Sequence, residues 1–156
     1  MLLMLCLPDK YGGIGLEYPN LNANIPRDDS VGHVTHFESM RPDLGWPGPR
    51  VAIEYDGGNH SDFGVRAVDA RRIQDYQVLG WKAFPATFAD ARGQGAFNRF
   101  AWHIVEALDP TGERGIVDGM ARLMRDAAFL ERQARLLAVL LPKGSECTPN
   151  DPVSRG

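Results

Sequence analysis

The sequence predicts an α/β (α+β) fold in which a mixed β-sheet core is flanked by helices. Strand-forming runs at 50–56 and 81–88 enclose a helical run at 65–79. Strands that alternate with helices are typical of α/β units. Two further helical runs follow, at 95–108 and 116–141, and we expect them to lie outside the sheet.

Shorter strands are expected before this unit. Residues 18–25 and 31–38 have strand-forming composition and flank the turn-prone "PRDDS", so we expect them to pair with each other. Residues 41–46 predict a further short strand, and Pro-Gly-Pro at 47–49 predicts a tight turn. The segment 50–56, "RVAIEYD", is the clearest strand because its β-branched and aromatic residues alternate with small or polar ones.

The next elements have recognisable ends. The helix at 65–79 should stop before Gly80, since glycine is favoured just past a helix C-terminus. Pro85 has no backbone N–H to donate, so 81–88 is expected to be an edge strand or to end there. The helix at 95–108 repeats apolar residues at helical spacing, and Asp109 and Pro110 end it.

The last periodic run predicts one long amphipathic helix over 116–141, stopped by Pro142. This helix either packs on its own sheet or mediates self-association. Its apolar stripe has approximately heptad spacing and consists of Met120, Leu123, Ala127, Leu130, Ala134, Leu137 and Leu141.

The composition is that of an ordinary globular protein, with 156 residues, 44% of them hydrophobic, and a formal charge of −3. This charge argues against a protein that coats nucleic acid by bulk charge, although a local basic face remains compatible with it. The opening "MLLMLCL" is too short for a signal peptide or a membrane span, and we expect it to pack on the body or to fray. Cys6 and Cys147 lack the spacing of a zinc cage. We therefore expect a reduced, cytoplasmic protein with no membrane partner.

Acidic residues gather around the central strand. Because side chains alternate, one face of 50–56 carries Val51, Ile53 and Tyr55, and the other carries Ala52, Glu54 and Asp56. Antiparallel pairing with the preceding strand would bring Asp43 close to Glu54 and Asp56, where the carboxylates repel one another unless a cation joins them. Mg²⁺ takes such oxygen ligands, and His60 could serve as a base beside it. The plain alternative is a strand with exposed acids that runs into a turn.

One face of the predicted helix 65–79 carries four residues at i, i+3, i+4 and i+7: Asp69, Arg72, Ile73 and Tyr76. In the structural interpretation, Ile73 and Tyr76 pack while Asp69 and Arg72 form a local ion pair at the rim. In the functional interpretation, Asp69 orients His60 and Arg72 holds a phosphate bidentately. The sequence does not separate the two.

In order along the chain, "RPDLGW", "RVAIEYDGGNH", Asp69-x-x-Arg72 and "LGWK" resemble the PD-(D/E)xK nuclease superfamily. More narrowly, they are similar to the branch of the very-short-patch-repair (Vsr) endonucleases and their small bacterial relatives. The resemblance covers residues 16–108 and implies a restriction-endonuclease-like sheet. It divides the chain into an N-terminal segment (1–15), an endonuclease-like domain (16–108), a helical extension (109–142) and a flexible tail (143–156).

The resemblance also implies roles for individual residues. Asp43 would be the central metal ligand, with Glu54 in the second acidic position. His60 would assist catalysis, and Asp69 would position it. Gly80 and Trp81 match a structural turn, so Trp81 is expected to pack.

One departure from the superfamily pattern matters for chemistry. Asp56 occupies the position of the usual lysine, two residues after the second acid, as in other members of this branch. The usual charge-stabilising cation is therefore missing. Structural-zinc cysteines of the repair enzymes are also absent from the sequence, so mismatch recognition is not implied.

The leading hypothesis is a divalent-metal-dependent endonuclease-like domain that hydrolyses DNA phosphodiester bonds with Mg²⁺ or Mn²⁺ on Asp43, Glu54 and Asp56. His60 would take or relay a proton. Phosphate contacts would come from a basic set, Arg66, Arg71, Arg72 and Lys82. The alternative is a non-catalytic nucleic-acid-binding or regulatory module of a bacterial defence or toxin–antitoxin system that retains the fold.

Overall fold

The computed structural model describes residues 1–27, 29–56 and 63–141, with the backbone alone for residues 56 and 63–69. The helices are α1 (Leu2–Cys6), α2 (Phe63–Val78), α3 (Phe88–Ala91), α4 (Gln94–Leu108), α5 (Ile116–Leu123) and α6 (Ala127–Leu140). The strands are β1 (Asn20–Leu21), β2 (Ile25–Pro26), β3 (Ser39–Met40), β4 (Leu44–Trp46), β5 (Val51–Asp56) and β6 (Lys82–Thr87). Two 3₁₀ turns, η1 (Asp9–Tyr11) and η2 (Asp29–Val31), complete the described elements.

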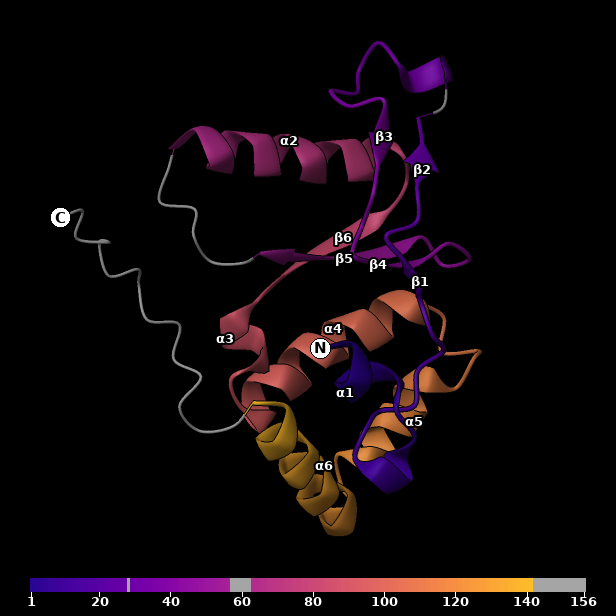
Figure 1. The fold of residues 1–156 in the computed structure, drawn as a ribbon. Helices are drawn as coiled ribbons and strands as arrows, with labels where there is room; N and C mark the ends of the chain where they lie inside the picture. Colours follow the sequence, from indigo (N-terminus) through magenta and orange to yellow (C-terminus); the bar gives the residue numbers. More distant parts are fainter. Residues whose placement is uncertain (28, 57–62, 142–156) are drawn as a thin grey trace, which may run out of the picture.

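A mixed sheet with the order β1-β4-β5-β6 lies at the centre of the fold. β5 pairs antiparallel with β4 and parallel with β6. The crossover from β5 to β6 is α2, which lies along one side of this sheet next to β2 and β3, whereas α1 and α3–α6 lie on the other side (Figure 1). The predicted mixed α/β core is therefore confirmed.

The two faces of β5 belong to different hydrophobic clusters, as the alternation predicted. Val51 and Ile53 point into a large cluster on the side of α4. Ala52 points into a small cluster under α2, together with Met40 and Tyr76. Glu54 shares the face of Ala52, and so it faces α2.

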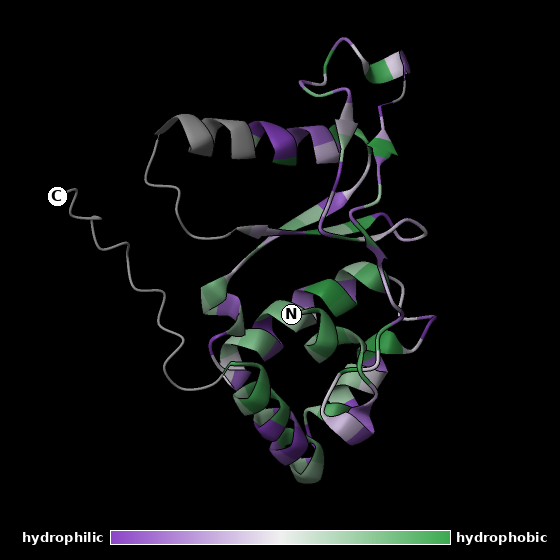
Figure 2. Cartoon of the chain, in the orientation of Figure 1, coloured by the Kyte–Doolittle hydropathy of each residue, from purple (hydrophilic) through white to green (hydrophobic). Residues whose placement is uncertain are grey.

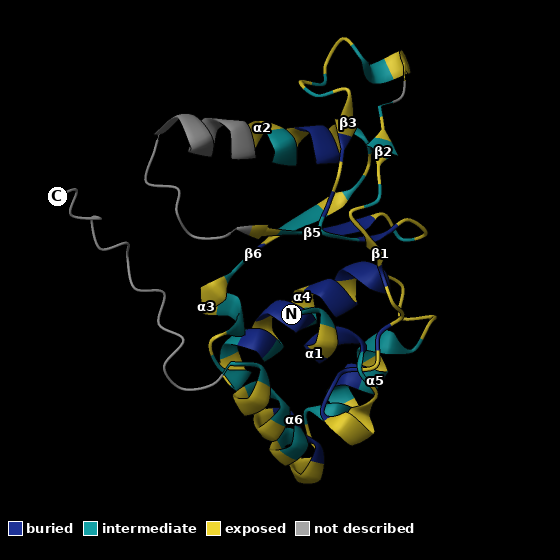
Figure 3. Ribbon diagram, viewed as in Figure 1, coloured by how far each residue is buried: buried dark blue, intermediate teal, exposed yellow. Residues whose placement is uncertain are grey.

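The large cluster joins segments that are far apart in the sequence. It combines α1, the sheet, α4 and α5 through buried residues such as Leu5, Ile53, Phe97, Ile104 and Met120. α1 packs into the body, which is one of the two outcomes expected for the opening segment, and its Met4, Leu5 and Cys6 are buried. Figures 2 and 3 show this concentration of hydrophobic, buried residues in α1 and α4, in contrast to the hydrophilic described part of α2.

Several local predictions are confirmed. Residues 47–50 form the turn between β4 and β5. Gly80 follows α2 with φ of 74°, a left-handed conformation that favours glycine. Pro85 lies in β6, which is an edge strand of the sheet.

The predicted pairing of 18–25 with 31–38 is wrong. β1 pairs with β4, and β2 pairs with β3, where Ile25 lies opposite Met40. Residues 31–38 contain no strand. The backbone N–H groups of His36 and Phe37 donate to the carboxylate of Asp75 on α2, at 2.8 and 2.9 Å, so they are not available to a strand ladder.

The single long helix predicted over 116–141 is also wrong, because α5 ends at Leu123 and α6 begins at Ala127. Asp126 breaks the run as the N-cap of α6, where its side chain accepts a hydrogen bond from the N–H of Ala128. The heptad stripe is not maintained across this break, and Ala127 and Ala134 are exposed.

The C-terminal helices pack on the chain's own core. Met120 and Phe129 are buried there. Buried Gln133 accepts a hydrogen bond from Gln94 and exchanges hydrogen bonds with Asn98, both on α4. Self-association through 116–141 stays a prediction. None of the helices in the described ranges has both the length and the apolar character needed to cross a bilayer.

Replacing Asp75 tests how α2 is fixed to the 36–37 segment. Asp75 is 1% exposed; burial raises its pKa, but the hydrogen bonds from His36 and Phe37 outweigh this, and the pKa lies below its usual 3.8. We expect Asp75→Asn to lower the free energy of unfolding at pH 7 by about 1–3 kcal/mol, as measured by urea denaturation.

The pH dependence of that loss gives a second readout. A carboxyl whose pKa is lowered by folding stabilises the protein above its unfolded pKa, and this stabilisation disappears as the pH falls through the lower folded value. The difference between wild type and Asp75→Asn should therefore shrink below pH 4. Exposed Asp118 on α5 provides the control, since Asp118→Asn should change little at either pH. Equal effects of the two variants would contradict the proposed role.

Candidate metal-binding and catalytic site

The structure brings Asp43 and Glu54 to adjacent positions. In the antiparallel pair of β4 and β5, Leu44 lies opposite Ile53. One step further along this register are Asp43 and Glu54. Asp43 is held in place because its Oδ2 accepts a hydrogen bond of 2.7 Å from the backbone N–H of Tyr55.

Glu54 is held from the other side by α2. Arg72 Nη2 donates to Glu54 Oε1 at 2.7 Å, and the hydroxyl of Tyr76 donates to the same oxygen at 2.6 Å. Arg72 and Tyr76 are four residues apart and therefore share one face of the helix. We call Glu54, Arg72 and Tyr76 the Glu54 clasp.

The clasp is partly buried, which strengthens its hydrogen bonds. The side chains of Arg72 and Glu54 are 36% and 21% exposed, and Tyr76 is fully buried. Burial and the hydrogen bond to Glu54 raise the pKa of Tyr76 far above its usual 10.0, so the phenol stays protonated and donates. Burial lowers the pKa of Arg72, but the bond to Glu54 more than offsets this and the pKa is raised.

The clasp uses only one of the two oxygens of Glu54. Within the described part of the chain, no hydrogen bond uses Glu54 Oε2 or Asp43 Oδ1. Carboxylate oxygens are the ligands that Mg²⁺ and Mn²⁺ prefer, so the donor chemistry of this pair fits such an ion. The described residues do not by themselves assemble three potential metal-binding side chains in one place.

The remaining predicted ligands fall at or beyond the edge of what the structure describes. Asp56 ends β5, where its backbone pairs with Thr87 of β6, but its side chain lies outside the described set. His60 lies outside the described residues. Asp69 belongs to α2, and its side chain is likewise not described, so its predicted pairing with Arg72 or His60 stays a prediction.

The phosphate contacts expected of the basic set stay a prediction, and the structure gives the following positions. Arg72 is engaged by Glu54, and Arg71 is exposed on α2. Arg66 lies on α2 with its side chain outside the described set. Lys82 begins β6 opposite Val51, so its backbone lies about 10 Å along the sheet from the position of Glu54.

Comparisons of the chain with protein-family models, with curated proteins and with solved structures gave no match. The resemblance to the Vsr branch of the PD-(D/E)xK nucleases therefore stays a prediction based on the ordered motifs.

The structure assigns Tyr76 a contact that the sequence reasoning missed. Tyr76 packs in the small cluster, as the structural interpretation expected, but its hydroxyl also binds Glu54. The sequence contained a signal for this contact. Arg72 and Tyr76 share a helix face, and Glu54 projects from the strand face that this helix covers. The packing role expected for Trp81 is confirmed by its place beside the same cluster.

Removal of the Tyr76 hydroxyl tests the clasp. Tyr76→Phe should lower the free energy of unfolding by about 1–2 kcal/mol, because a buried hydrogen bond to a charged acceptor is lost while the ring is kept. Tyr55→Phe is the matched control, since Tyr55 is 50% exposed, and it should change stability by less than about 0.5 kcal/mol. Chemical denaturation measures both.

The dependence of stability on alkaline pH distinguishes a hydrogen bond of the Tyr76 hydroxyl from simple packing of the Tyr76 ring. The folded state keeps the Tyr76 proton above pH 10, whereas the unfolded chain releases it there, so wild-type stability should fall as the pH rises above 10. Tyr76→Phe should lack this part of the decline. A parallel decline in both proteins would show that the hydroxyl bond does not matter energetically.

Proposed function

We propose that this protein is a divalent-metal-dependent endonuclease-like hydrolase that cleaves DNA phosphodiester bonds. The observation that supports the proposal is the placement of Asp43 and Glu54 side by side at one end of the β4–β5 pair, each with one carboxylate oxygen fixed. Two carboxylates held this close favour a shared cation. The ordered motifs of the sequence point to the same chemistry.

Each residue would have its own role in this hydrolysis. Asp43 Oδ1 and Glu54 Oε2 would hold Mg²⁺ or Mn²⁺, with Asp56 as a further ligand or hydrogen-bond acceptor. When bound, the ion supplies Lewis acidity and favours ionisation of a water molecule. His60 would take or relay the proton of the attacking water. The N–H of Tyr55 and the Glu54 clasp keep the two carboxylates from rotating away.

In this proposal Arg72 acts through Glu54 as well as on the phosphate. Its bond to Glu54 places a guanidinium, 36% exposed, beside the carboxylates. In this proposal, that cation stabilises the charge that develops on the phosphate. It thereby supplies the positive charge that Asp56 cannot supply from the lysine position.

One observation favours a second candidate, the non-catalytic nucleic-acid-binding or regulatory module. Arg72 already neutralises Glu54 at 2.7 Å, which reduces the negative charge that would attract a metal ion. A site balanced in this way is compatible with a domain that binds nucleic acid without cutting it.

A nicking assay with isosteric variants separates the two candidates. Purified protein is incubated with supercoiled plasmid and Mg²⁺ or Mn²⁺, next to Asp43→Asn and Glu54→Gln. These variants keep an oxygen for the Tyr55 N–H and for the clasp, but remove the charge of a metal ligand. We expect nicking to fall at least about 100-fold, because even the loss of a group that only supports a ligand costs about 10- to 100-fold.

Glu131→Gln is the control, since Glu131 is exposed on α6, on the other side of the sheet. It should nick as the wild type does. Equal nicking by Asp43→Asn and wild type would indicate a contaminating nuclease and remove the hydrolytic proposal. Plasmid binding without metal-dependent nicking, measured by gel shift, would favour the binding module.

A further inference from the structure

A cleft of about 850 Å³ opens on the side of the sheet away from the Glu54 clasp. It lies between α1, the segment 14–17, Trp46 of β4, and α5. Its walls combine apolar residues, among them Leu16, Trp46, Ile116 and Leu123, with charged side chains. Clefts of roughly 300–1,000 Å³ with apolar walls are typical of sites for small molecules.

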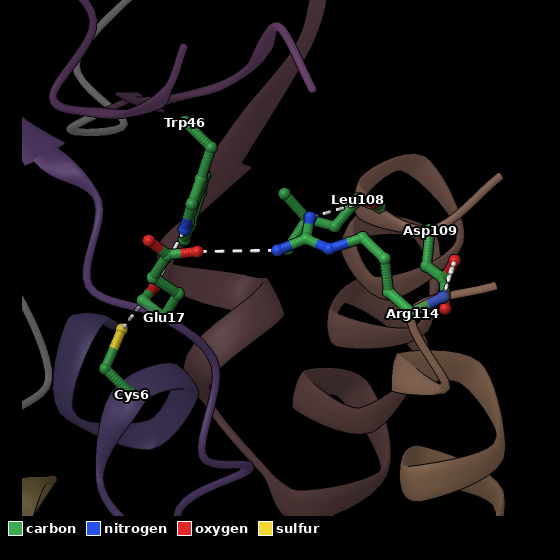
Figure 4. A network of polar contacts seen from close by, with 6 residues as sticks. All are labelled: Cys6, Glu17, Trp46, Leu108, Asp109 and Arg114. Carbon is green, nitrogen blue, oxygen red and sulfur yellow. Dashed lines mark hydrogen bonds and ion pairs between the residues drawn. The ribbon is translucent and has the colours of Figure 1, made fainter. Parts of the chain in front are cut away.

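The ion pair of Glu17 and Arg114 lies at this cleft (Figure 4). Arg114 Nη1 donates to the carbonyl of Leu108 at 3.2 Å, and Nη2 reaches Glu17 Oε2 at 3.4 Å. The side chains of Arg114 and Glu17 are 47% and 77% exposed, so their pairing contributes little to stability. A carboxylate entering the cleft can therefore replace Glu17 on the guanidinium at small cost.

Two other polar groups near the cleft, Asp109 and Cys6, do not offer a binding site for a carboxylate. Asp109, which is 2% exposed, accepts hydrogen bonds from the N–H groups of Arg114 and Ile116 at 3.1 and 2.8 Å, so the start of α5 is already capped. Burial raises the pKa of Cys6 to about 11, which keeps its thiol neutral. The charged side chains that complete the lining are Asp9 and Arg122.

Gly119 leaves open space on the α5 side of the cleft. It lies inside α5 and lines the cleft, although glycine in a helix interior costs about 0.5–1 kcal/mol relative to alanine. Gly12 and Gly13 are required by the fold, because an added Cβ would come within 2.8 Å of neighbouring backbone atoms. At Gly119 an added Cβ would meet no atom within 4 Å, and its φ is not positive. Neither packing nor backbone conformation explains this glycine.

We propose that this cleft binds a small amphipathic carboxylate, with its apolar body against the half-buried Ile116 and Leu123 and its carboxylate on Arg114. The missing side chain at Gly119 leaves room for the apolar body against the α5 backbone. The site is separate from the proposed hydrolytic site, since the cleft faces the large core and the carboxylates of Asp43 and Glu54 lie toward α2.

Isothermal titration with decanoate tests the proposal, with decylamine as a probe of equal length and opposite charge. We expect decanoate to bind the wild type at a stoichiometry of one, and decylamine to bind at least about tenfold more weakly. Arg114→Gln should weaken decanoate binding about tenfold, the ratio expected for one charge-assisted hydrogen bond. Gly119→Leu should weaken it at least as much by filling the cleft.

Two alanine variants form a matched pair. Gly119→Ala should raise the melting temperature, because alanine is the better helix former, and should weaken decanoate binding several-fold. Gly95→Ala makes the same change near the start of α4, outside the cleft, and should leave binding unchanged. Absence of decanoate binding to the wild type, or binding unaffected by Gly119→Leu, would overturn the site. Equal affinity for decanoate and decylamine would overturn the assignment of Arg114 to a carboxylate.

Discussion

One carboxylate holds the candidate site of this protein together. Glu54 projects from the central strand toward a helix, and its Oε1 accepts hydrogen bonds from Arg72 and Tyr76 of that helix. Asp75, between them, fixes the segment before β3 through two backbone N–H groups. Among the residues whose side chains are described, the cluster under α2 is small: it contains Met40, Ala52 and Tyr76 as buried hydrophobic residues, with a few partly buried ones packed against them. Polar contacts therefore carry much of the attachment of this part of α2. A loss of these bonds would release the helix and the orientation of Glu54 together.

The other side of the sheet is organised differently. There a large apolar cluster joins α1, α4 and α5 to the sheet, and its stability comes from burial of apolar surface. Apolar packing therefore fixes one face of β5, and hydrogen bonds orient the side chains on the other face. The strand backbone is fixed by the core, so the side chains on the opposite face can be oriented by a few hydrogen bonds without shifting the strand.

Much of the sheet and of the acidic pair could be predicted from the sequence because both depend on local rules. Alternation along 51–56 assigned Val51 and Glu54 to opposite faces, and Gly80 marked the end of α2. Two predictions were wrong, the strand at 31–38 and the single helix over 116–141, because contacts distant in sequence or a competing local signal decided the structure there. Residues 31–38 have strand-forming composition, but the backbone N–H groups of His36 and Phe37 donate to Asp75, which lies about forty positions away in the chain. Apolar periodicity at 116–141 concealed the N-cap at Asp126, whose residue type was itself a visible helix-start signal.

The role of Arg72 shows why the site was harder to predict than the fold. From sequence, Arg72 could pair with Asp69 on its own helix or reach a phosphate, and spacing within one helix cannot decide between partners. The sheet decides, because it places Glu54 across from the helix face and a carboxylate in a partly buried position needs donors. Once Glu54 has recruited Arg72, a cation stands beside the acidic pair. The position of this positive charge is thus set by which acid is partly buried, and the spacing of residues along the strand does not reveal it.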